Sequence, residues 1–267
     1  MNTLAILLLL FVMLAISLPV GFAMGVAGIA GLYMTGGWEM VRGILTTAPM
    51  SGVNSYDLIP IPMFLLMAEF VLLSGVADDL FAAAAAWIGR VRGGLGMATA
   101  LAGAGFGAIC GTSTASAATL SSTTLPAMVK QGYEPQMAAG VVAISGTLAM
   151  LIPPTVIMII FGLIANVSIP KLLIAGILPA VLVTITIMLT VYVLAVMKPK
   201  SAPVSEGTPW RKKFRLLVNT SPMLVLMAFV TGSIYAGVAT VTESAALGAV
   251  GGLGVALYRG RLTWKTL

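Results

Sequence analysis

Hydroxyl side chains are concentrated in one part of an otherwise apolar chain. Between Gly94 and Tyr133 the sequence reads Cys110-Gly111-Thr112-Ser113-Thr114-Ala115-Ser116, and a second hydroxyl cluster follows at 121–124. At a tight turn, hydroxyl and freed carbonyl oxygens suit a weakly held alkali cation, whereas the N–H groups that begin the next helix suit an anion. The first cluster is therefore a candidate binding site. The second is explained by Ser and Thr bonding to carbonyls one turn back.

A second interruption follows at 146–155, which reads Gly146-Thr147-Leu148-Ala149-Met150-Leu151-Ile152-Pro153-Pro154-Thr155. The proline pair lacks N–H donors and breaks a helix, so the carbonyls of Ala149, Leu151 and Ile152 cannot all be satisfied within it. Thr155 is placed to cap the following half-helix. In lipid, open backbone is tolerated only where protein covers it or where it lines a cavity. We therefore expect the two interruptions to form one site for a small ligand.

The composition is that of an integral membrane protein. Of 267 residues, 59% are hydrophobic and 8% are charged, and the mean hydropathy is +1.08, all far from an ordinary soluble domain. The single cysteine, Cys110, excludes an intramolecular disulfide. The first residues lack the basic region of a cleaved signal peptide, so the first helix is expected to remain.

Apolar stretches predict an all-α, multi-span helical bundle with no soluble domain. Their lengths suit a bilayer core of about 30 Å, if the first two are short and one helix is tilted. The predicted segments are 3–18, 22–36, 58–76, a helical hairpin at 94–130, a proline-broken helix at 136–166, and helices at 171–197, 214–237 and 241–258.

The basic residues favour a hairpin at 94–130 that enters and leaves the membrane on one side. With that topology, only Arg42 and Lys171 lie on the outer face, which places the amino terminus outside the cell by the positive-inside rule. The net charge of +6 then reflects topology and not nucleic-acid binding. The residues on the cytoplasmic face are Arg90, Arg92, Lys130, Lys198, Lys200, Arg211, Lys212, Lys213, Arg215, Arg259, Arg261 and Lys265.

The same layout predicts the organisation of the chain. Residues 1–93 are expected to form scaffold helices and, at 77–92, an arm helix in the membrane interface, with Asp78 and Asp79 at its start and Arg90 and Arg92 at its end. Three further parts follow: membrane helices at 94–197, a cytoplasmic loop at 198–213 and membrane helices at 214–267, which the family resemblance given below implies are a transport repeat and the truncated start of a second repeat.

Two acidic residues lie in apolar surroundings. Glu69 is in the middle of a predicted span, where a charge is expensive, so it either couples protons or makes a buried structural or subunit contact. Glu243 follows Thr240 by three residues, which predicts a capping box at the start of the last helix.

These motifs together resemble a known family, and the likeness runs in order over nearly the whole chain. The sequence is similar to the large permease subunit of tripartite ATP-independent periplasmic (TRAP) transporters. The motifs that carry the resemblance are 106–113 (FGAICGTS), 125–128 (LPAM), Gly132-Tyr133, Gly146-Thr147, 152–155 (IPPT), 242–246 (TESAA) and 262–264 (LTW).

The resemblance implies a sodium-driven, elevator-type importer of organic acids in the bacterial inner membrane. It implies two protein partners, a small four-helix membrane subunit and a periplasmic substrate-binding protein, and no cofactor beyond sodium as coupling ion. The sodium ligands carried over are Cys110, Gly111, Ser113, Ala149, Ile152 and Pro154, mostly through carbonyls. The candidate substrate contacts are Thr112, Ser113, Thr114, Ser116 and Thr155.

Two departures from the family pattern stand out. Cys110 occupies a tip position where the family has serine, which favours a carbonyl over a side-chain ligand there. The family also continues into a second, inverted repeat with its own hairpin and broken helix, and the chain ends at Leu267. The resemblance thus describes a truncated form or fragment, or a half whose partner is another chain.

Two other classes of function compete with transport. An intramembrane hydrolase could use Ser113 or Cys110, but the chain has no histidine, so only a Ser–Lys dyad with Lys130 or Lys171 remains, and both lysines lie at membrane boundaries. A channel or noncatalytic scaffold is the third possibility. Repeated pore-lining polar rings are missing from the sequence, and a scaffold has no need of the polar tip.

Overall fold

The computed structural model describes residues 2–54, 56–199, 201–204 and 208–260. These residues contain eleven α-helices, two short 3₁₀-helices and no strand, and five of the helices are long and apolar enough to cross a membrane. The prediction of an all-α membrane protein is confirmed. The chain divides into two compact units, Met1–Tyr56 and Asp57–Leu267, a boundary that falls within the predicted 1–93 segment.

Unit 1 is a pair of helices, α1 (Asn2–Ala15) and α2 (Val20–Val53). They pack where Gly31 meets Ile6, whose Cδ1 lies 2.9 Å from the position of a β-carbon on that glycine. The predicted end of the second apolar helix at residue 36 agrees with the backbone, because Gly37 is non-helical, with a φ of 66°, and separates two helical stretches within α2. Glycine accepts this backbone conformation without steric cost.

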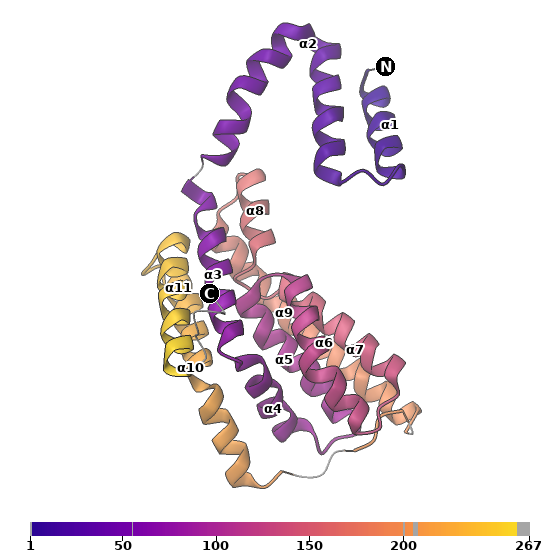
Figure 1. Cartoon of the computed structure of the whole chain (residues 1–267), viewed down its shortest axis with the longest axis vertical. Helices are drawn as coiled ribbons and strands as arrows, with labels where there is room; N and C mark the ends of the chain where they lie inside the picture. The colour runs from indigo at the N-terminus through magenta and orange to yellow at the C-terminus, as the bar shows by residue number, and fades with distance from the viewer. Residues whose placement is uncertain (1, 55, 200, 205–207, 261–267) are drawn as a thin grey trace. The chain divides into compact units, whose positions relative to one another are not determined.

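Unit 2 contains the remaining helices (Figure 1). A 3₁₀ turn, η1 (Tyr56–Leu58), precedes it at the boundary. Its helices are α3 (Pro60–Leu73), α4 (Val76–Ile88), α5 (Gly94–Cys110), α6 (Ser113–Lys130), α7 (Pro135–Thr147), η2 (Leu148–Met150), α8 (Val156–Ile164), α9 (Ile169–Met197), α10 (Trp210–Tyr235) and α11 (Val241–Tyr258).

The predicted hairpin is present as α5 and α6. The chain reverses at Gly111, whose φ of 59° is again one that glycine tolerates best. The far ends of the two arms meet as well, since the Tyr133 hydroxyl accepts a hydrogen bond from the backbone N–H of Leu95 at 3.2 Å. The start of α5 and the end of α6 therefore lie at the same end of unit 2.

Helix α11 packs along α3 through small residues. A β-carbon on Gly248 would lie 2.7 Å from the Met67 sulfur, and one on Gly252 would lie 3.2 Å from the Met67 carbonyl oxygen.

Glu69 is exposed on α3, whereas Phe64, Met67 and Val71 are buried. Glu69 therefore makes no buried contact within the described part of this chain.

The expected capping box of α11 is confirmed. The Glu243 carboxylate accepts from the Thr240 N–H at 2.8 Å, and the Thr240 hydroxyl accepts from the Glu243 N–H at 3.3 Å.

The arm helix α4 is shorter than predicted. It has Asp78 and Asp79 in its first turn but ends at Ile88, so Arg90 and Arg92 follow the helix instead of closing it.

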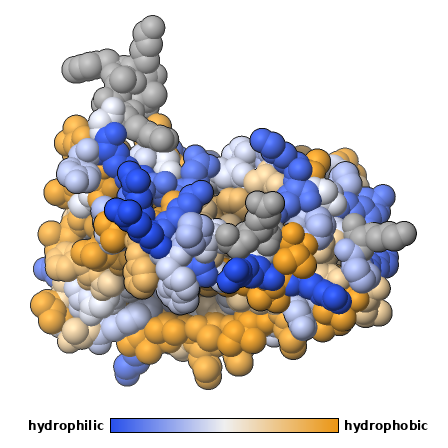
Figure 2. Space-filling view, turned by 90° about the horizontal axis from the view of Figure 1, so that it is seen from below, coloured by the Kyte–Doolittle hydropathy of each residue, from blue (hydrophilic) through white to orange (hydrophobic). Residues whose placement is uncertain are grey.

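At one end of unit 2, the turn between α6 and α7 lies beside the chain that follows α9. The Glu134 N–H donates to the Ser201 carbonyl at 3.0 Å and the Ser201 hydroxyl donates to the Glu134 carboxylate at 2.7 Å, which joins the α6–α7 turn to the chain after α9. Seen from below, Figure 2 shows hydrophilic residues collected between apolar surfaces.

The predicted basic residues Lys200, Arg261 and Lys265 lie outside the described residues, as does the 262–264 motif.

Candidate functional site

The hairpin tip packs directly on the broken helix. A β-carbon on Gly111 would lie 3.0 Å from the carbonyl oxygen of Pro154, and one on Gly107 would lie 2.6 Å from the Cα of Ala149. Neither neighbour is a flexible side chain, so these approaches require glycine. The structure thus brings together the two interruptions that the sequence marks.

The break consists of non-helical backbone between two short helices. Helix α7 ends at Thr147, a 3₁₀ turn follows, and α8 begins only at Val156; the peptide bond between Pro153 and Pro154 is cis. The Thr155 hydroxyl accepts from the Met158 N–H at 3.1 Å, which confirms the predicted cap. The end of α7 and the start of α8 therefore both face a partly buried stretch of open backbone.

The tip hydroxyls differ in exposure. Thr112 precedes α6 in extended conformation and makes no side-chain cap, so the first N–H groups of that helix have no partner from it. Thr112 and Ser113 are half-buried and Thr114 is exposed. A ligand at the tip can reach these three residues without displacing a cap.

Ser116 lies deeper than the other candidate substrate contacts. Its side chain is fully buried and its hydroxyl has no hydrogen-bond partner in the described protein, and the same is true of Ser145 on α7. The sequence analysis did not single out Ser145, although it directly precedes Gly146 at the start of the break. Helices α6 and α7 are close here, since a β-carbon on Gly146 would lie 2.9 Å from the Cα of Ala117.

Cys110 contributes its side chain to packing. It is buried with Ala68, Ala77 and Phe106 in one apolar cluster. Only its backbone carbonyl, among the last carbonyls of α5, remains as a ligand. The other carried-over sodium ligands lie on the break: Ala149 and Pro154 are buried, and Ile152 is half-buried.

The tip is built from neutral groups. Within the described residues, no group of three His, Cys, Asp or Glu side chains could hold a metal ion. A cation here would be held by carbonyl and hydroxyl oxygens, which favours a monovalent ion bound weakly. The Ser113–Lys130 pair of the hydrolase alternative lies at opposite ends of α6, about 25 Å apart at 1.5 Å per residue.

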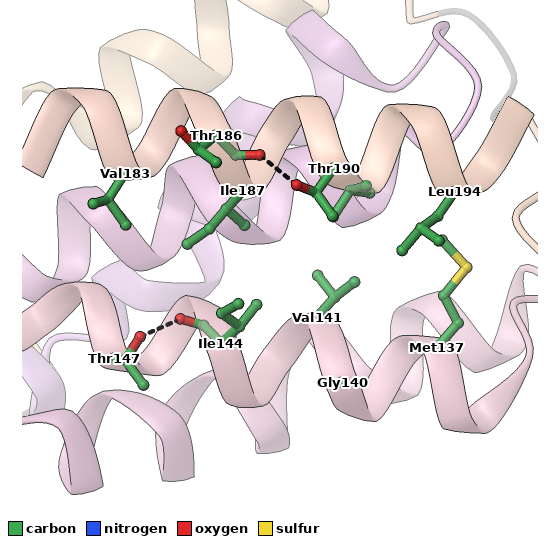
Figure 3. A pocket seen from close by; sticks show the side chains of 11 residues that line it. Met137, Gly140, Val141, Ile144, Thr147, Val183, Thr186, Ile187, Thr190 and Leu194 are labelled. Carbon is green, nitrogen blue, oxygen red and sulfur yellow. Dashed lines mark hydrogen bonds between the residues drawn. The ribbon is translucent and has the colours of Figure 1, made fainter.

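Another cavity, of about 560 Å³, lies between α7 and α9 (Figure 3). Its threonines bond to their own helices: Thr147 to the Ile144 carbonyl at 2.7 Å, Thr186 to that of Leu182 at 2.8 Å and Thr190 to that of Thr186 at 2.8 Å. The remaining lining is apolar. Since its hydroxyls already have partners, this groove offers less to a polar ligand than the tip.

A hairpin tip set against a broken membrane helix is an arrangement typical of helical membrane transport proteins. Comparison with known proteins specifies the family. Residues 7–267 match the model of the DctM component of the tripartite ATP-independent periplasmic transporter. The chain belongs to this family.

Curated relatives agree with the family match. The chain is similar to the C4-dicarboxylate TRAP transporter large permease proteins of Vibrio cholerae (31% identity, 89% of this chain, 52% of the relative) and Pseudomonas aeruginosa (37%, 76% and 47%). It is also similar to the sialic acid TRAP transporter permease protein of Haemophilus influenzae (30%, 98% and 42%). The chain thus spans about half the length of the curated relatives that it matches.

Proposed function

We propose that the chain is the membrane permease part of a sodium-coupled importer of organic acids in the bacterial inner membrane, with its amino terminus on the periplasmic side. The observation that carries this proposal is the contact between the Gly111 turn and the Pro154 carbonyl. It places carbonyls at the end of α5 and along the break, which suit a cation, beside the uncapped start of α6, which suits a carboxylate.

The proposal extends to partners and substrate class. A small four-helix membrane subunit and a periplasmic binding protein complete the importer, and the family supports both. Relatives named for C4-dicarboxylate and sialic acid support an organic acid as substrate. Exposed Glu69 is available for a subunit contact on α3.

In the mechanism that we propose, sodium binds first and orders the tip. Its ligands are the carbonyls of Cys110, Gly111, Ala149, Ile152 and Pro154 with the Ser113 hydroxyl. The substrate carboxylate then engages the hydroxyls of Thr112, Ser113, Thr114, Ser116 and Thr155 and the start of α6. Because each ligand stabilises the same closed arrangement, each raises the affinity of the other by the same factor.

Sodium binding to the purified chain tests the site directly. Thermal unfolding in detergent is followed while sodium replaces potassium at constant ionic strength. Ser113→Ala removes one oxygen, at a cost on the order of 1–3 kcal/mol, which weakens apparent sodium affinity roughly 5- to 150-fold. The matched control is Ser122→Ala, because that exposed hydroxyl bonds to the Thr119 carbonyl within its own helix. Equal sodium dependence in wild type and both variants would refute the site.

Uptake tests the activity. The chain is reconstituted in proteoliposomes with its membrane and periplasmic partners, and labelled C4-dicarboxylate or sialic acid is supplied with or without a sodium gradient. We expect uptake only with the gradient and all components. Uptake that ignores sodium would contradict the coupling but not the family.

A further inference from the structure

A cationic groove lies on the first half of α10, away from the hairpin tip along the chain. Its volume is about 950 Å³. The groove runs along one face of the helix, because Arg211, Arg215 and Asn219 are spaced four residues apart. Its lining residues are Pro209, Arg211, Lys212, Arg215, Leu216 and Asn219.

The three cations of this groove are available to a ligand. Arg211, Lys212 and Arg215 are all exposed, and the lining contains no acidic side chain among the described residues. The ion pair that the described structure contains nearby is Asp79–Arg259, in the adjoining groove, where Arg259 also donates to the Asn219 carbonyl. The adjoining carboxylate is therefore already neutralised.

Lys213 does not line the groove but packs among aromatic side chains, and these indicate the depth of the groove in the membrane. It is buried, with its Nζ 5.5 Å from the ring centre of Trp87 and 5.1 Å from that of Trp210. The ring centres of the two indoles are 6.0 Å apart, and Phe214 stacks on Trp210 and meets Trp87 edge to face. Tryptophans gather at the headgroup level of bilayers, so the cluster places the groove at the membrane–water boundary.

The surface that continues from the groove along α10 is apolar. Val218 and Val225 are each 66% exposed, and Phe229 is 55% exposed. A ligand that fits both parts carries negative charge at one end and hydrocarbon at the other. A soluble anion satisfies only the cations, and a neutral lipid satisfies only the apolar surface.

We propose that this groove binds the headgroup phosphate of an anionic phospholipid, with the acyl chains along the exposed side chains of α10. Arg211 and Arg215 present planar guanidinium groups that pair with phosphate oxygens in bidentate geometry, and Lys212 adds a third charge. A basic pocket at the edge of a membrane helix is a recognised kind of lipid site. The bound lipid fixes α10, and with it α4, at the membrane surface.

Native mass spectrometry of the purified full chain tests this proposal, with phosphatidylglycerol and phosphatidylcholine titrated separately. We expect wild type to retain phosphatidylglycerol in preference to phosphatidylcholine. Replacing Arg211, Lys212 and Arg215 together by Gln should weaken phosphatidylglycerol binding by about tenfold or more. The matched control replaces Arg90, Arg92 and Lys130 by Gln, which removes as many exposed charges near the same end of unit 2.

The outcomes separate the candidates. Loss of phosphatidylglycerol in the groove variant with retention in the control supports the proposal. Equal loss in both variants would overturn it, because general surface charge would then explain binding. Inorganic phosphate added at matched concentration tests the soluble alternative. If it displaces phosphatidylglycerol from wild type, the groove is an anion site and the lipid assignment is wrong.

Discussion

Gly107 lies against Ala149 so closely that a β-carbon on the glycine would be 2.6 Å from the Cα and 3.0 Å from the backbone nitrogen of Ala149. This contact joins the first arm of the hairpin to the 3₁₀ turn of the break. The two backbones can approach this closely only because residue 107 is glycine. The distance between the hairpin and the break therefore depends on that glycine.

Gly107→Ala is expected to destabilise the protein by about 1–3 kcal/mol, because backbone atoms must move to admit the new methyl group. Thermal unfolding in detergent measures this, and apparent sodium affinity should fall with it. Gly140→Ala on α7 is the control, since nothing lies within 4 Å of its β-carbon position. In an exposed helix that change stabilises by about 0.5–1 kcal/mol. A similar loss in both variants would argue against the tip contact.

Ser145→Ala should leave stability unchanged or raise it when sodium is absent. Its buried hydroxyl lacks a partner in the described protein, and a buried unsatisfied group costs about 1–3 kcal/mol. Thr124→Val serves as the contrast, because the buried Thr124 hydroxyl bonds to the Leu120 carbonyl at 2.8 Å. A marked loss of stability for Ser145→Ala alone would show that its hydroxyl has a partner in the resting protein.

Tyr133→Phe should cost about 1–3 kcal/mol by leaving the buried Leu95 N–H without an acceptor. The effect has a pH signature as well. Burial raises the pKa of Tyr133, against the opposing effect of hydrogen bonds from Gly96 and Leu95. The folded state therefore holds this proton more tightly than the unfolded state. The resulting stability is complete below the ordinary tyrosine pKa and is lost as the pH rises through the raised value.

Unfolding measured from neutral to strongly alkaline pH checks this sign. The wild type should lose stability at the alkaline end more steeply than Tyr133→Phe, so the two curves converge. Parallel curves would mean that Tyr133 does not titrate with unfolding.

Cysteine labelling tests how the hairpin enters the membrane. In a Cys110→Ala background, Val91→Cys and Gln131→Cys are placed before α5 and after α6. Both should react with an impermeant maleimide from the cytoplasmic side only. Val167→Cys, in the exposed turn between α8 and α9, should react from the periplasmic side. Labelling of the first two positions from opposite sides would exclude a re-entrant hairpin.

Sequence patterns were sufficient to predict the helices and both interruptions. The proline pair and the Cys110–Ser116 hydroxyls break helical rules locally, so their positions could be recognised without coordinates. The exposure of Glu69 could not be, because it depends on which face of α3 finds a neighbour. Ser145 was missed for the same reason. Its spacing is ordinary, and only packing against α6 makes it buried without a partner.

The hydrogen bond between Tyr133 and Leu95 also determines how the hairpin can move. It fastens the base of the arms, while the tip is held by van der Waals contact with the break. The first arm has 17 residues and so is about 25 Å long. A rotation of about 5° around the base would then displace the tip by roughly 2 Å. In this geometry a small turn at the base of the hairpin would be enough to separate the tip from the break.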